Sequence, residues 1–430
     1  MTTVAAERPV STRGRAAFTA LLVAEGISIL GTRMSTVALP WLVLTTTGSA
    51  ARTGLVAFAE MTPYVLVMAM GGPVIDRVGA RRTSLFCDGL AAASVALIPV
   101  AYVAGVLHFA VLLALIAAVG AARGFADTSK RLLVPPLVDL SGLPLERVTG
   151  LHDGVSRSAG LVGAPVAGLL IGLFGAPGVL AVDAVTFAAA AVIVGVALPA
   201  AIWSVAAPTD APATGGLPRY ARELREGLAW LRRHRLMCGI AAMVGVTNLL
   251  DVAFATVLVP TWATSLTSGA LALGVVFGAM AGGAVLGNVL AAWAGPRLPR
   301  YRTYAWGFLI CGAPRFLVLM LVHDLPVTAA VVFVTCIGSG VINPILGAVE
   351  YEAVPREYQA RVLGAVGALA WAGMPIGGLL AGWAVGALGL TTALGIAAAV
   401  YLTATLSPFV FPCWRRMDRP PHPGAEFGAG

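Results

Sequence analysis

The chain has 430 residues, of which 58% are hydrophobic and 11% are charged, and its mean hydropathy is +0.88. A soluble globular chain has about 25% charged residues, so this composition excludes a soluble protein and indicates an all-α integral membrane protein. The net charge is +8, but the basic residues are scattered between apolar runs and form no basic domain, which argues against a nucleic-acid partner.

Long apolar runs follow one another along the whole chain, and each has at least the ~20 residues that a helix needs to cross a bilayer. We expect twelve transmembrane helices, at 17–46, 53–75, 84–107, 109–128, 149–174, 177–203, 237–265, 270–294, 303–322, 326–349, 360–387 and 390–412. The first run is far longer than the apolar core of a cleaved signal peptide. It is therefore expected to be the first membrane-spanning helix.

The basic residues between these runs predict the orientation of the chain in the membrane. The segments expected on one side contain Arg8, Arg13, Arg15, Arg77, Arg81, Arg82, Lys130, Arg131, Arg147, six Arg from Arg219 to Arg235, Arg297, Arg300, Arg302, Arg356, Arg361, Arg415, Arg416 and Arg419. The segments on the other side contain Arg52 alone. Because basic residues are retained on the cytoplasmic side, we expect a multi-pass plasma-membrane protein with both termini in the cytoplasm.

A polar segment divides the twelve runs into two sets of six. The expected organisation is a cytoplasmic tail (1–16), a first six-helix bundle (17–203), a cytoplasmic linker (204–236), a second six-helix bundle (237–412) and a cytoplasmic tail (413–430). Within the linker, Leu224, Leu228 and Leu231 recur at helical spacing opposite charged residues. This pattern predicts an amphipathic helix on the inner membrane surface, which is either a plain connector or a strut that couples the two halves.

The segment between the second and third runs is rich in glycine and charge. It contains Gly72, Asp76, Arg77, Gly79, Arg81 and Arg82. Such a segment is expected to form a short cytoplasmic loop, in which the first glycine allows a close helix approach and Gly79 allows a tight reversal. Asp76 either moderates the local positive charge or caps the positive end of another helix in one conformation and releases it in another. Asp127 is expected to accept a bond from Arg77 or Arg81.

The two halves repeat one another. The segment from Gly163 to Leu170, with Pro165 and Gly168, recurs as the segment from Gly373 to Leu380, with Pro375 and Gly378. Span five also has Gly160, Gly168 and Gly172 on one helical face. Faces of small residues allow helices to pack closely in lipid, so these glycines are expected to be helix-packing positions in two pseudo-symmetric bundles.

These motifs resemble the major facilitator superfamily. The spacing from Gly72 through Asp76-Arg77 and Gly79 to Arg81-Arg82 is similar to the family loop between helices two and three, although Ala80 replaces a basic residue. The stretch from Gly31 to Leu44 resembles the branch of the enterobactin exporter and of macrolide and antibiotic exporters, although Thr32 replaces a frequent Asp. The resemblance implies a conformational-switch loop and a central cavity between two bundles. Span five around Pro165 is similar to the antiporter motif of drug exporters.

Ionisable residues inside the runs are candidates for coupling transport to protons, because each costs ~2.5–3.5 kcal/mol to insert into a membrane. The candidates are Glu25, Arg33, Glu60, Asp251 and Arg315. Glu25, Glu60 or Asp251 is expected to carry the proton, or to be held by Arg33 or Arg315 for structure alone. Asp153 and Arg157 are one turn apart and are expected to neutralise each other, and Asp183 is expected at the outer end of span six.

The function that these features favour is secondary active export of amphipathic small molecules, such as drugs, antibiotics or siderophore-like compounds, in exchange for protons. Lys130, the only lysine, follows a serine, so no phosphate-binding Gly-Lys pair of an ATPase is present. Proton- or ion-coupled import is the alternative, and an integral-membrane enzyme finds less support because the five His are isolated. We expect a monomer with no cofactor and no metal, and the odd number of five Cys argues against a disulfide framework.

Overall fold

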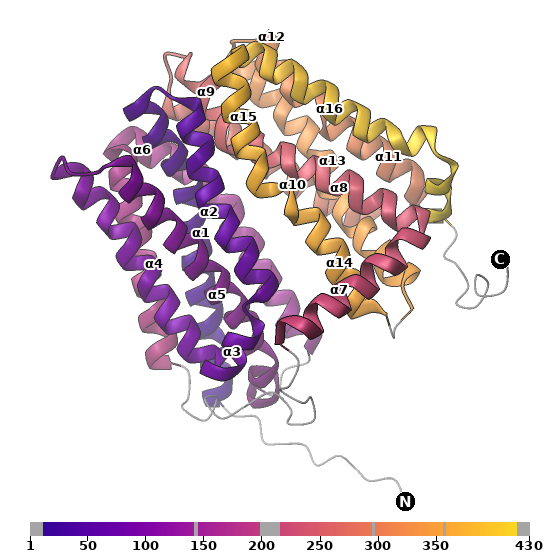
Figure 1. The fold of residues 1–430 in the computed structure, drawn as a ribbon, viewed down its shortest axis with the longest axis horizontal. Helices are drawn as coiled ribbons and strands as arrows, with labels where there is room; N and C mark the ends of the chain where they lie inside the picture. The colour runs from indigo at the N-terminus through magenta and orange to yellow at the C-terminus, as the bar shows by residue number, and fades with distance from the viewer. Residues whose placement is uncertain (1–11, 142–144, 198–215, 295–296, 356–357, 419–430) are drawn as a thin grey trace, which may run out of the picture. The chain divides into compact units, whose positions relative to one another are not determined.

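The computed structural model describes residues 12–141, 145–197, 216–294, 297–355 and 358–418, and every regular element in these ranges is a helix (Figure 1). The α-helices in the first part of the chain are α1 (Thr12–Thr47), α2 (Ala50–Met70), α3 (Gly72–Val78), α4 (Ala80–Val103), α5 (Phe109–Ser141) and α6 (Leu145–Ala197). After the linker come α7 (Gly216–Arg233), α8 (Arg235–Ala253), η2 (Phe254–Leu258, a π-helix), α9 (Val259–Thr264), α10 (Ala270–Ala294), α11 (Arg300–Cys311), α12 (Ala313–Leu321), α13 (Leu325–Ala353), α14 (Gln359–Ala372), α15 (Met374–Leu388), α16 (Leu390–Val410) and the 3₁₀-helix η4 (Pro412–Asp418).

Within the described residues, eleven helical stretches are long and apolar enough to cross a membrane. One of them, Ser158–Ala197, has 40 residues and would be about 60 Å long at 1.5 Å per residue, which is twice the thickness of the hydrocarbon core. Its backbone leaves the helical conformation at Gly175, where φ is 71° and ψ is 167°. This break lies where the sequence predicts the end of span five and the start of span six, so the stretch supplies both spans.

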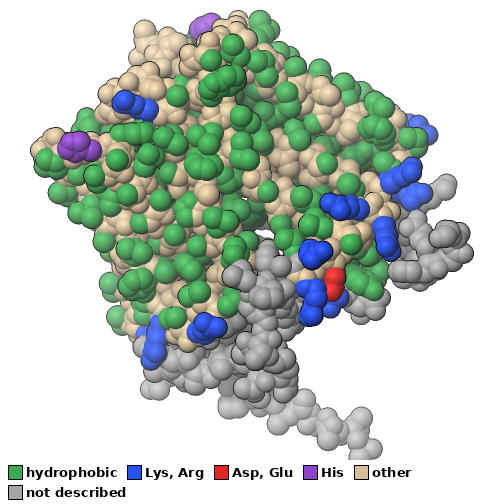
Figure 2. Space-filling model, in the orientation of Figure 1, with side chains coloured by type: hydrophobic (Ala, Val, Ile, Leu, Met, Phe, Trp, Pro, Cys, Tyr) green, Lys and Arg blue, Asp and Glu red, His purple; other side chains and the backbone are tan. Residues whose placement is uncertain are grey.

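The surface of the helices is what a lipid environment requires. Many large apolar side chains are exposed on this surface, among them Phe86 at 71%, Trp293 at 72% and Val196 at 83% exposure. Figure 2 shows hydrophobic side chains over most of the visible helix surface. In water such a surface would be an aggregation hazard, and in a bilayer it is the normal exterior of a multi-pass protein.

Two compact units make up the fold. The first contains Met1–Ala38, Ala59–Leu170 and Phe174–Ala213, and the second contains Leu39–Phe58, Ile171–Leu173 and Thr214–Gly430. In the first unit, α5 packs against α2 through glycines: a Cβ on Gly120 would overlap the carbonyl oxygen of Glu60, and a Cβ on Gly124 would lie 2.9 Å from that of Tyr64. Only glycine permits so close a contact between two backbones.

Glycines also pack against backbone carbonyl groups in the second unit. Gly283 and Gly287 of α10 lie on the carbonyls of Phe333 and Ile337 in α13, and Gly377 of α15 lies on the carbonyl of Leu249 in α8. A cluster of buried residues that includes Leu231, Met237, Tyr304, Val362 and Trp414 joins α7, α8, α11, α14 and η4 at one end of this unit. That end is therefore a packed structure and not a set of separate loops.

Two local expectations differ from the structure. The expected loop after α2 is largely a helix, α3, and Gly79 alone forms the reversal into α4, with φ 92°. The close helix approach belongs to Gly71, whose Cβ would lie 2.9 Å from the ring of Phe125, whereas a Cβ on Gly72 would meet nothing within 4 Å. Gly72 instead begins α3, where it precedes Pro73 at a position that suits proline.

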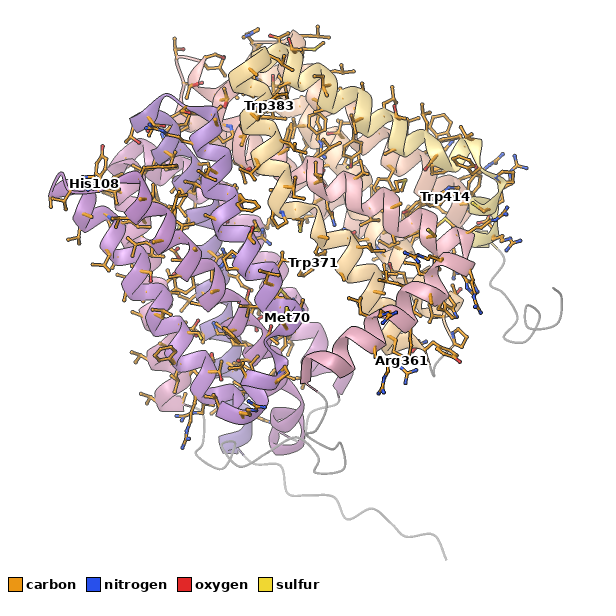
Figure 3. The ribbon with its side chains drawn as sticks, in the orientation of Figure 1. Met70, His108, Arg361, Trp371, Trp383 and Trp414 are labelled. Carbon is orange, nitrogen blue, oxygen red and sulfur yellow. The ribbon has the colours of Figure 1, made fainter. Side chains whose placement is uncertain are left out.

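The amphipathic helix of the linker is present as α7, and the part of the linker at 204–215 lies outside the described residues. α7 packs on α14: a Cβ on Gly227 would overlap the carbonyl oxygen of Arg361, and Arg361 Nη1 lies 2.9 Å from Glu226 Oε2. Figure 3 shows Arg361 at this contact. α7 thus packs partly on α14 of the second unit. The sequence predicts its position on the inner membrane surface but does not identify this protein contact.

Candidate functional site

Glu60 of α2 forms a buried ion pair with Arg123 of α5 in the first unit. Glu60 is 6% exposed and Arg123 is 9% exposed. A charge inside a membrane span is tolerated when a partner compensates it, and here each residue is the partner of the other. Glu60 is among the candidates that the sequence indicates, whereas Arg123 is not.

A second polar contact lies one helical turn further along the same two helices. The hydroxyl of Tyr64 donates a hydrogen bond of 3.2 Å to Asp127, and the guanidinium carbon of Arg123 lies 5.4 Å from the centre of the Tyr64 ring. Glu60 and Tyr64 are four residues apart, as are Arg123 and Asp127, so two polar stripes face each other along α2 and α5. Tyr64 therefore occupies the place beside Asp127 that the sequence predicts for Arg77 or Arg81.

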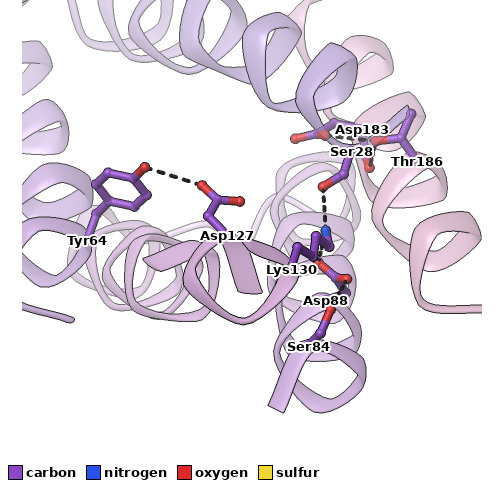
Figure 4. Close-up of polar contacts among 8 residues, drawn as sticks. All are labelled: Ser28, Tyr64, Ser84, Asp88, Asp127, Lys130, Asp183 and Thr186. Atoms are coloured by element: carbon purple, nitrogen blue, oxygen red, sulfur yellow. Dashed lines mark hydrogen bonds and ion pairs between the residues drawn. The ribbon is translucent and has the colours of Figure 1, made fainter. Parts of the chain in front are cut away.

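Lys130 is fully buried at the centre of a polar network that joins three helices (Figure 4). Its ammonium lies 3.0 Å from Asp88 Oδ1 on α4 and donates to the hydroxyl of Ser28 on α1 at 3.3 Å. The hydroxyl of Ser84 donates to the other oxygen of Asp88 at 3.3 Å. The carboxylate and the ammonium thus compensate each other in a region without access to water, and they hold α1, α4 and α5 together.

Asp183 is also buried, with 0% exposure. It accepts hydrogen bonds from Ser35 of α1 and from Thr186, the latter at 3.1 Å. A Cβ on Gly31 would overlap both Asp183 and Thr186. Asp183 therefore belongs to a tight polar contact between α1 and α6, which a glycine on α1 makes possible.

Glu25 of α1 lies opposite His152 of α6, with 2.6 Å between Oε2 and Nε2, and both residues are buried. The arginines that the sequence offers for holding such a carboxylate are Arg33 and Arg315. Arg33 instead has an exposed side chain that lies over two glycines of α6: a Cβ on Gly160 would be 3.5 Å from its Nε, and one on Gly163 would be 2.6 Å from its Cβ. The structure thus joins Glu25 to a histidine of another helix.

Asp251 and Arg315, two of the candidates that the sequence indicates, form an ion pair in the second unit. The guanidinium carbon lies 4.9 Å from the ring centre of Phe254, 5.1 Å from that of Phe316 and 5.1 Å from that of Tyr401. Phe254 begins the π-helix η2, so the regular α-helix of span seven is interrupted beside the pair. Single-turn π segments occur often at functional positions.

The residues of the expected switch loop do not form one cluster. Arg77 and Arg82 are exposed, whereas Arg81 is 7% exposed and donates a hydrogen bond to the carbonyl oxygen of Gly195 in α6. The side chain of Asp76 lies outside what the structure describes, as do those of Asp153 and Arg157. Arg81 is thus a contact between α4 and the end of α6.

The small-residue motifs lie at helix contacts. Gly168 is buried and Pro165 lies inside α6. Gly373 lies between α14 and α15, and Pro375 is in the first turn of α15. A Cβ on Gly378 would lie 2.8 Å from the Cβ of Ala57, and both residues belong to the second unit. Gly163, Gly373 and Gly378 therefore occupy packing positions.

An open apolar groove of about 550 Å³ runs between α1 and α6 in the first unit. It is lined by Gly26, Ile27, Leu30, Leu151, Gly154, Val155, Ser158, Ala159 and Val162. Within the described residues no group of three or more His, Cys, Asp or Glu side chains could hold a metal ion.

The sequence of the whole chain matches a family of membrane transporters. The model of the Major Facilitator Superfamily matches residues 21–255 and again residues 241–430. The chain belongs to the major facilitator superfamily. The two matches together cover nearly the whole chain and confirm the resemblance that the sequence motifs indicate.

Characterised relatives of this superfamily member cover almost its full length. It is 29% identical over 408 residues to the multidrug efflux pump Tap of Mycobacterium tuberculosis and of Mycobacterium bovis, with 93% of this chain and 94% of the relative covered. It is 27% identical over 394 residues to the multidrug efflux pump Tap of Mycolicibacterium fortuitum, with coverages of 90% and 94%.

Solved structures show the same fold. A nucleoside transporter NupG variant has a TM-score of 0.73 at 13% identity and covers 92% of this chain and 99% of its own. A bacterial homologue of the human lysosomal transporter Spinster, in an inward-facing and unoccupied conformation, has a TM-score of 0.64 at 13% identity, with coverages of 95% and 98%. The chain is therefore a multi-pass membrane transporter with the major facilitator fold.

The charged site residues of this transporter that are absent from the sequence-based candidates share one signal. Arg123, Lys130 and Asp88 all lie in predicted spans or directly beside them, and each carries a charge. The rule that indicates Glu60, namely that a charge inside a span needs an explanation, applies to them equally. Tyr64 and His152 carry no such signal, because neither side chain needs to be charged.

Proposed function

We propose that this transporter exports amphipathic small molecules, such as drugs or antibiotics, in exchange for protons by alternating access. The observation that carries the proposal is the similarity to multidrug efflux pumps over 93% of the chain. Nearly every part of the chain therefore has a counterpart in an exporter. We also propose that it works as a monomer in the plasma membrane, with both termini in the cytoplasm and with bundles at 17–203 and 237–412 joined by a linker at 204–236.

Asp251 is a suitable proton carrier because its carboxylate is accessible while its partner is not. The Asp251 side chain is 43% exposed and the Arg315 side chain is 4% exposed. A proton from solution neutralises the carboxylate, whereas a guanidinium keeps its charge at every physiological pH. Protonation therefore leaves Arg315 without its counter-ion, and the aromatic faces around it are its remaining support. In this proposal, loss of the counter-ion makes the buried position of Arg315 less favourable and so couples protonation of Asp251 to the packing around Arg315.

Glu60 is the second candidate, and its surroundings differ. Both members of the Glu60–Arg123 pair are buried, and Tyr64 and Asp127 extend the polar contact by one turn. Protonation of Glu60 would release Arg123, with Asp127 one helical turn away on the same helix. In this proposal a proton on Glu60 changes how α2 and α5 pack, and Glu25 with His152 holds α1 to α6.

Transport in reconstituted vesicles tests the coupling. Purified protein in liposomes should drive ethidium across the membrane when an inside-acid pH gradient is imposed, and a protonophore should abolish the signal. We expect Glu60→Gln and Asp251→Asn to lower the initial rate at least tenfold. Glu352→Gln is the matched control, because Glu352 is a half-exposed carboxylate held by Arg300 near a helix end. Equal rates for all three variants would remove both carboxylates from the coupling.

Drug resistance and drug accumulation in cells test the direction of transport. Expression in a host that lacks its own efflux pumps should raise the inhibitory concentrations of a panel of amphipathic drugs and should lower the cell-associated drug. If cell-associated compound rises instead, the transporter imports its substrate and the export proposal fails.

The same cells test the switch loop. Asp76→Asn, at equal expression, should abolish resistance if the switch loop works as the family resemblance implies. Wild-type efflux from that variant would exclude Asp76 from the mechanism.

A further inference from the structure

Several membrane-crossing helices of the second unit begin or end at the same level. The candidate spans in α8, α11 and α14 begin at Arg235, Arg300 and Arg361, and α16 ends at Val410, directly before η4. The hydrophobic cluster that includes Leu231, Tyr304, Val362 and Trp414 shows that these ends lie together. The side chains that start the spans therefore lie where hydrocarbon gives way to lipid headgroups.

A set of exposed arginines surrounds this end, and we name it the arginine rim. Its members are Arg225, Arg232, Arg233, Arg235, Arg302 and Arg415. Three acidic residues at this end of the described chain have partners: Glu226 faces Arg361 at 2.9 Å, Glu352 accepts from Arg300 Nη2 at 3.0 Å, and Asp418 accepts from the backbone N of Tyr301 at 3.0 Å. Figure 2 shows basic side chains gathered over α7 and the neighbouring helix ends, with a single acidic one visible among them.

The rim is carried by packed elements. η4 is anchored by the buried side chains of Trp414 and Met417, and the Trp414 ring stacks on that of Tyr304 with 5.8 Å between ring centres. Gly239 of α8 packs against the same indole, because a Cβ on this glycine would lie 3.1 Å from the ring. α7 is fixed to α14 through Gly227. Positive charge is thus held at defined places, as a binding surface requires.

An aromatic surface lies directly beneath one rim residue. Trp306 is four residues after Arg302 in α11, so the two side chains share one helical face, and both are exposed. The Trp306 ring makes an edge-to-face contact with Phe409 of α16, with 5.4 Å between ring centres. An exposed indole one turn below a guanidinium, at the start of a span, is the arrangement found where membrane proteins meet the interface between headgroups and acyl chains.

We propose that the arginine rim binds anionic phospholipids, with the phosphate on Arg302 and its neighbours and an acyl chain along Trp306 and Phe409. Guanidinium groups donate paired hydrogen bonds to phosphate oxygens, and juxtamembrane basic clusters are attracted to anionic lipid surfaces. An acidic soluble protein would match the charge but not the exposed aromatic pair below it. The proposal is independent of the direction of transport and of the nature of the substrate.

Lipid titration of the full-length protein in detergent tests this proposal. The apparent affinity for phosphatidylglycerol should exceed that for phosphatidylcholine of the same chain length by about tenfold, as measured by native mass spectrometry of bound lipid, and the preference should fall at high salt. The variant Arg232→Gln/Arg233→Gln/Arg302→Gln/Arg415→Gln should lose the preference. The matched variant with four Lys at the same positions should keep most of it, and Trp306→Ala should weaken both lipids alike.

Three results would overturn the proposal: equal affinity of the wild-type protein for the two lipids, an unchanged preference in the Gln variant, or a preference that salt does not alter. The salt series uses the wild-type protein alone, so it remains informative if a variant fails to fold. Binding of acidic proteins by the rim without any lipid preference would assign the surface to another partner. None of these outcomes bears on drug export, which is measured separately.

Discussion

Arg315 and Asp251 form an ion pair whose two members differ in exposure: the guanidinium side chain is 4% exposed and the carboxylate side chain is 43% exposed. The buried member is the one that keeps its charge at every physiological pH. Loss of the carboxylate therefore leaves a permanent charge among Phe254, Phe316 and Tyr401, whereas loss of the arginine leaves a carboxylate that the protein does not enclose.

This difference predicts unequal effects on stability. We expect Asp251→Ala to lower the free energy of unfolding by about 3–5 kcal/mol, because it leaves an uncompensated buried charge. Arg315→Met should cost less, about 1–2 kcal/mol, because a methionine fills the apolar enclosure and the half-exposed Asp251 is not buried in protein. Unfolding of the purified protein in detergent measures both. Equal losses would show that the exposure of Asp251 does not matter to the pair.

Lys130 and Asp88 provide the contrasting case, in which both members are buried. Each single change, Lys130→Met or Asp88→Leu, should lower the free energy of unfolding by about 3–5 kcal/mol. The double variant should lose clearly less than the sum, because no charge is then left uncompensated. A double-mutant cycle in detergent measures this coupling. An additive result would mean that the pair contributes nothing beyond two separate side chains.

A methyl group at Gly120 tests the close contact between α2 and α5. Gly120→Ala would place a Cβ on the carbonyl oxygen of Glu60, and overpacking of this kind costs about 1–3 kcal/mol. Gly89→Ala is the matched control, because a Cβ there meets nothing within 4 Å and alanine favours the helix by up to ~1 kcal/mol. Thermal unfolding should therefore separate the two variants in opposite directions, and a neutral Gly120→Ala would show that α2 can move away without loss.

The sequence was sufficient for the fold because its decisive signals are local. Twenty-residue apolar runs define the spans, and the expected boundary between spans five and six, after residue 174 and before 177, coincides with the observed break at Gly175. Arginine density separates the two kinds of connecting segment. None of these signals requires knowledge of which helices are neighbours.

The partners of the buried charges depend on that knowledge, and for this reason the sequence alone could not identify them. Glu60 and Arg123 are 63 residues apart, and Lys130 and Ser28 are 102 apart. Glu25 could be matched to Arg33 from spacing along one helix, but the observed partner, His152, comes from another helix. The burial of Asp183 could not be read from its run either, because it depends on the glycine at position 31, which brings α1 close to it.

The contact between α7 and α14 predicts how the linker helix is held. Gly227→Leu would drive a side chain into the backbone at Arg361 and should release α7 from the second unit. Trypsin should then cleave at Arg232 and Arg233 faster than in the wild-type protein. Glu226→Gln removes a half-exposed ion pair, which is worth ~1 kcal/mol or less, so its cleavage rate should stay near that of the wild type. Similar rates for both variants would show that packing at Gly227 does not hold the helix.

Gly175 is the residue on which the separation of spans five and six depends. Its φ of 71° and ψ of 167° lie in a region that is almost restricted to glycine. Gly175→Ala should therefore cost about 1–3 kcal/mol, and Gly175→Val should cost more because a β-branched side chain tolerates positive φ less well. Gly172→Ala, one turn earlier in a helical conformation with nothing within 4 Å of the added methyl, is the control and should leave the unfolding temperature unchanged or slightly raised. If Gly175→Ala were as stable as that control, the backbone at this point would be free to adopt another conformation, and another residue would have to make the break between the two spans.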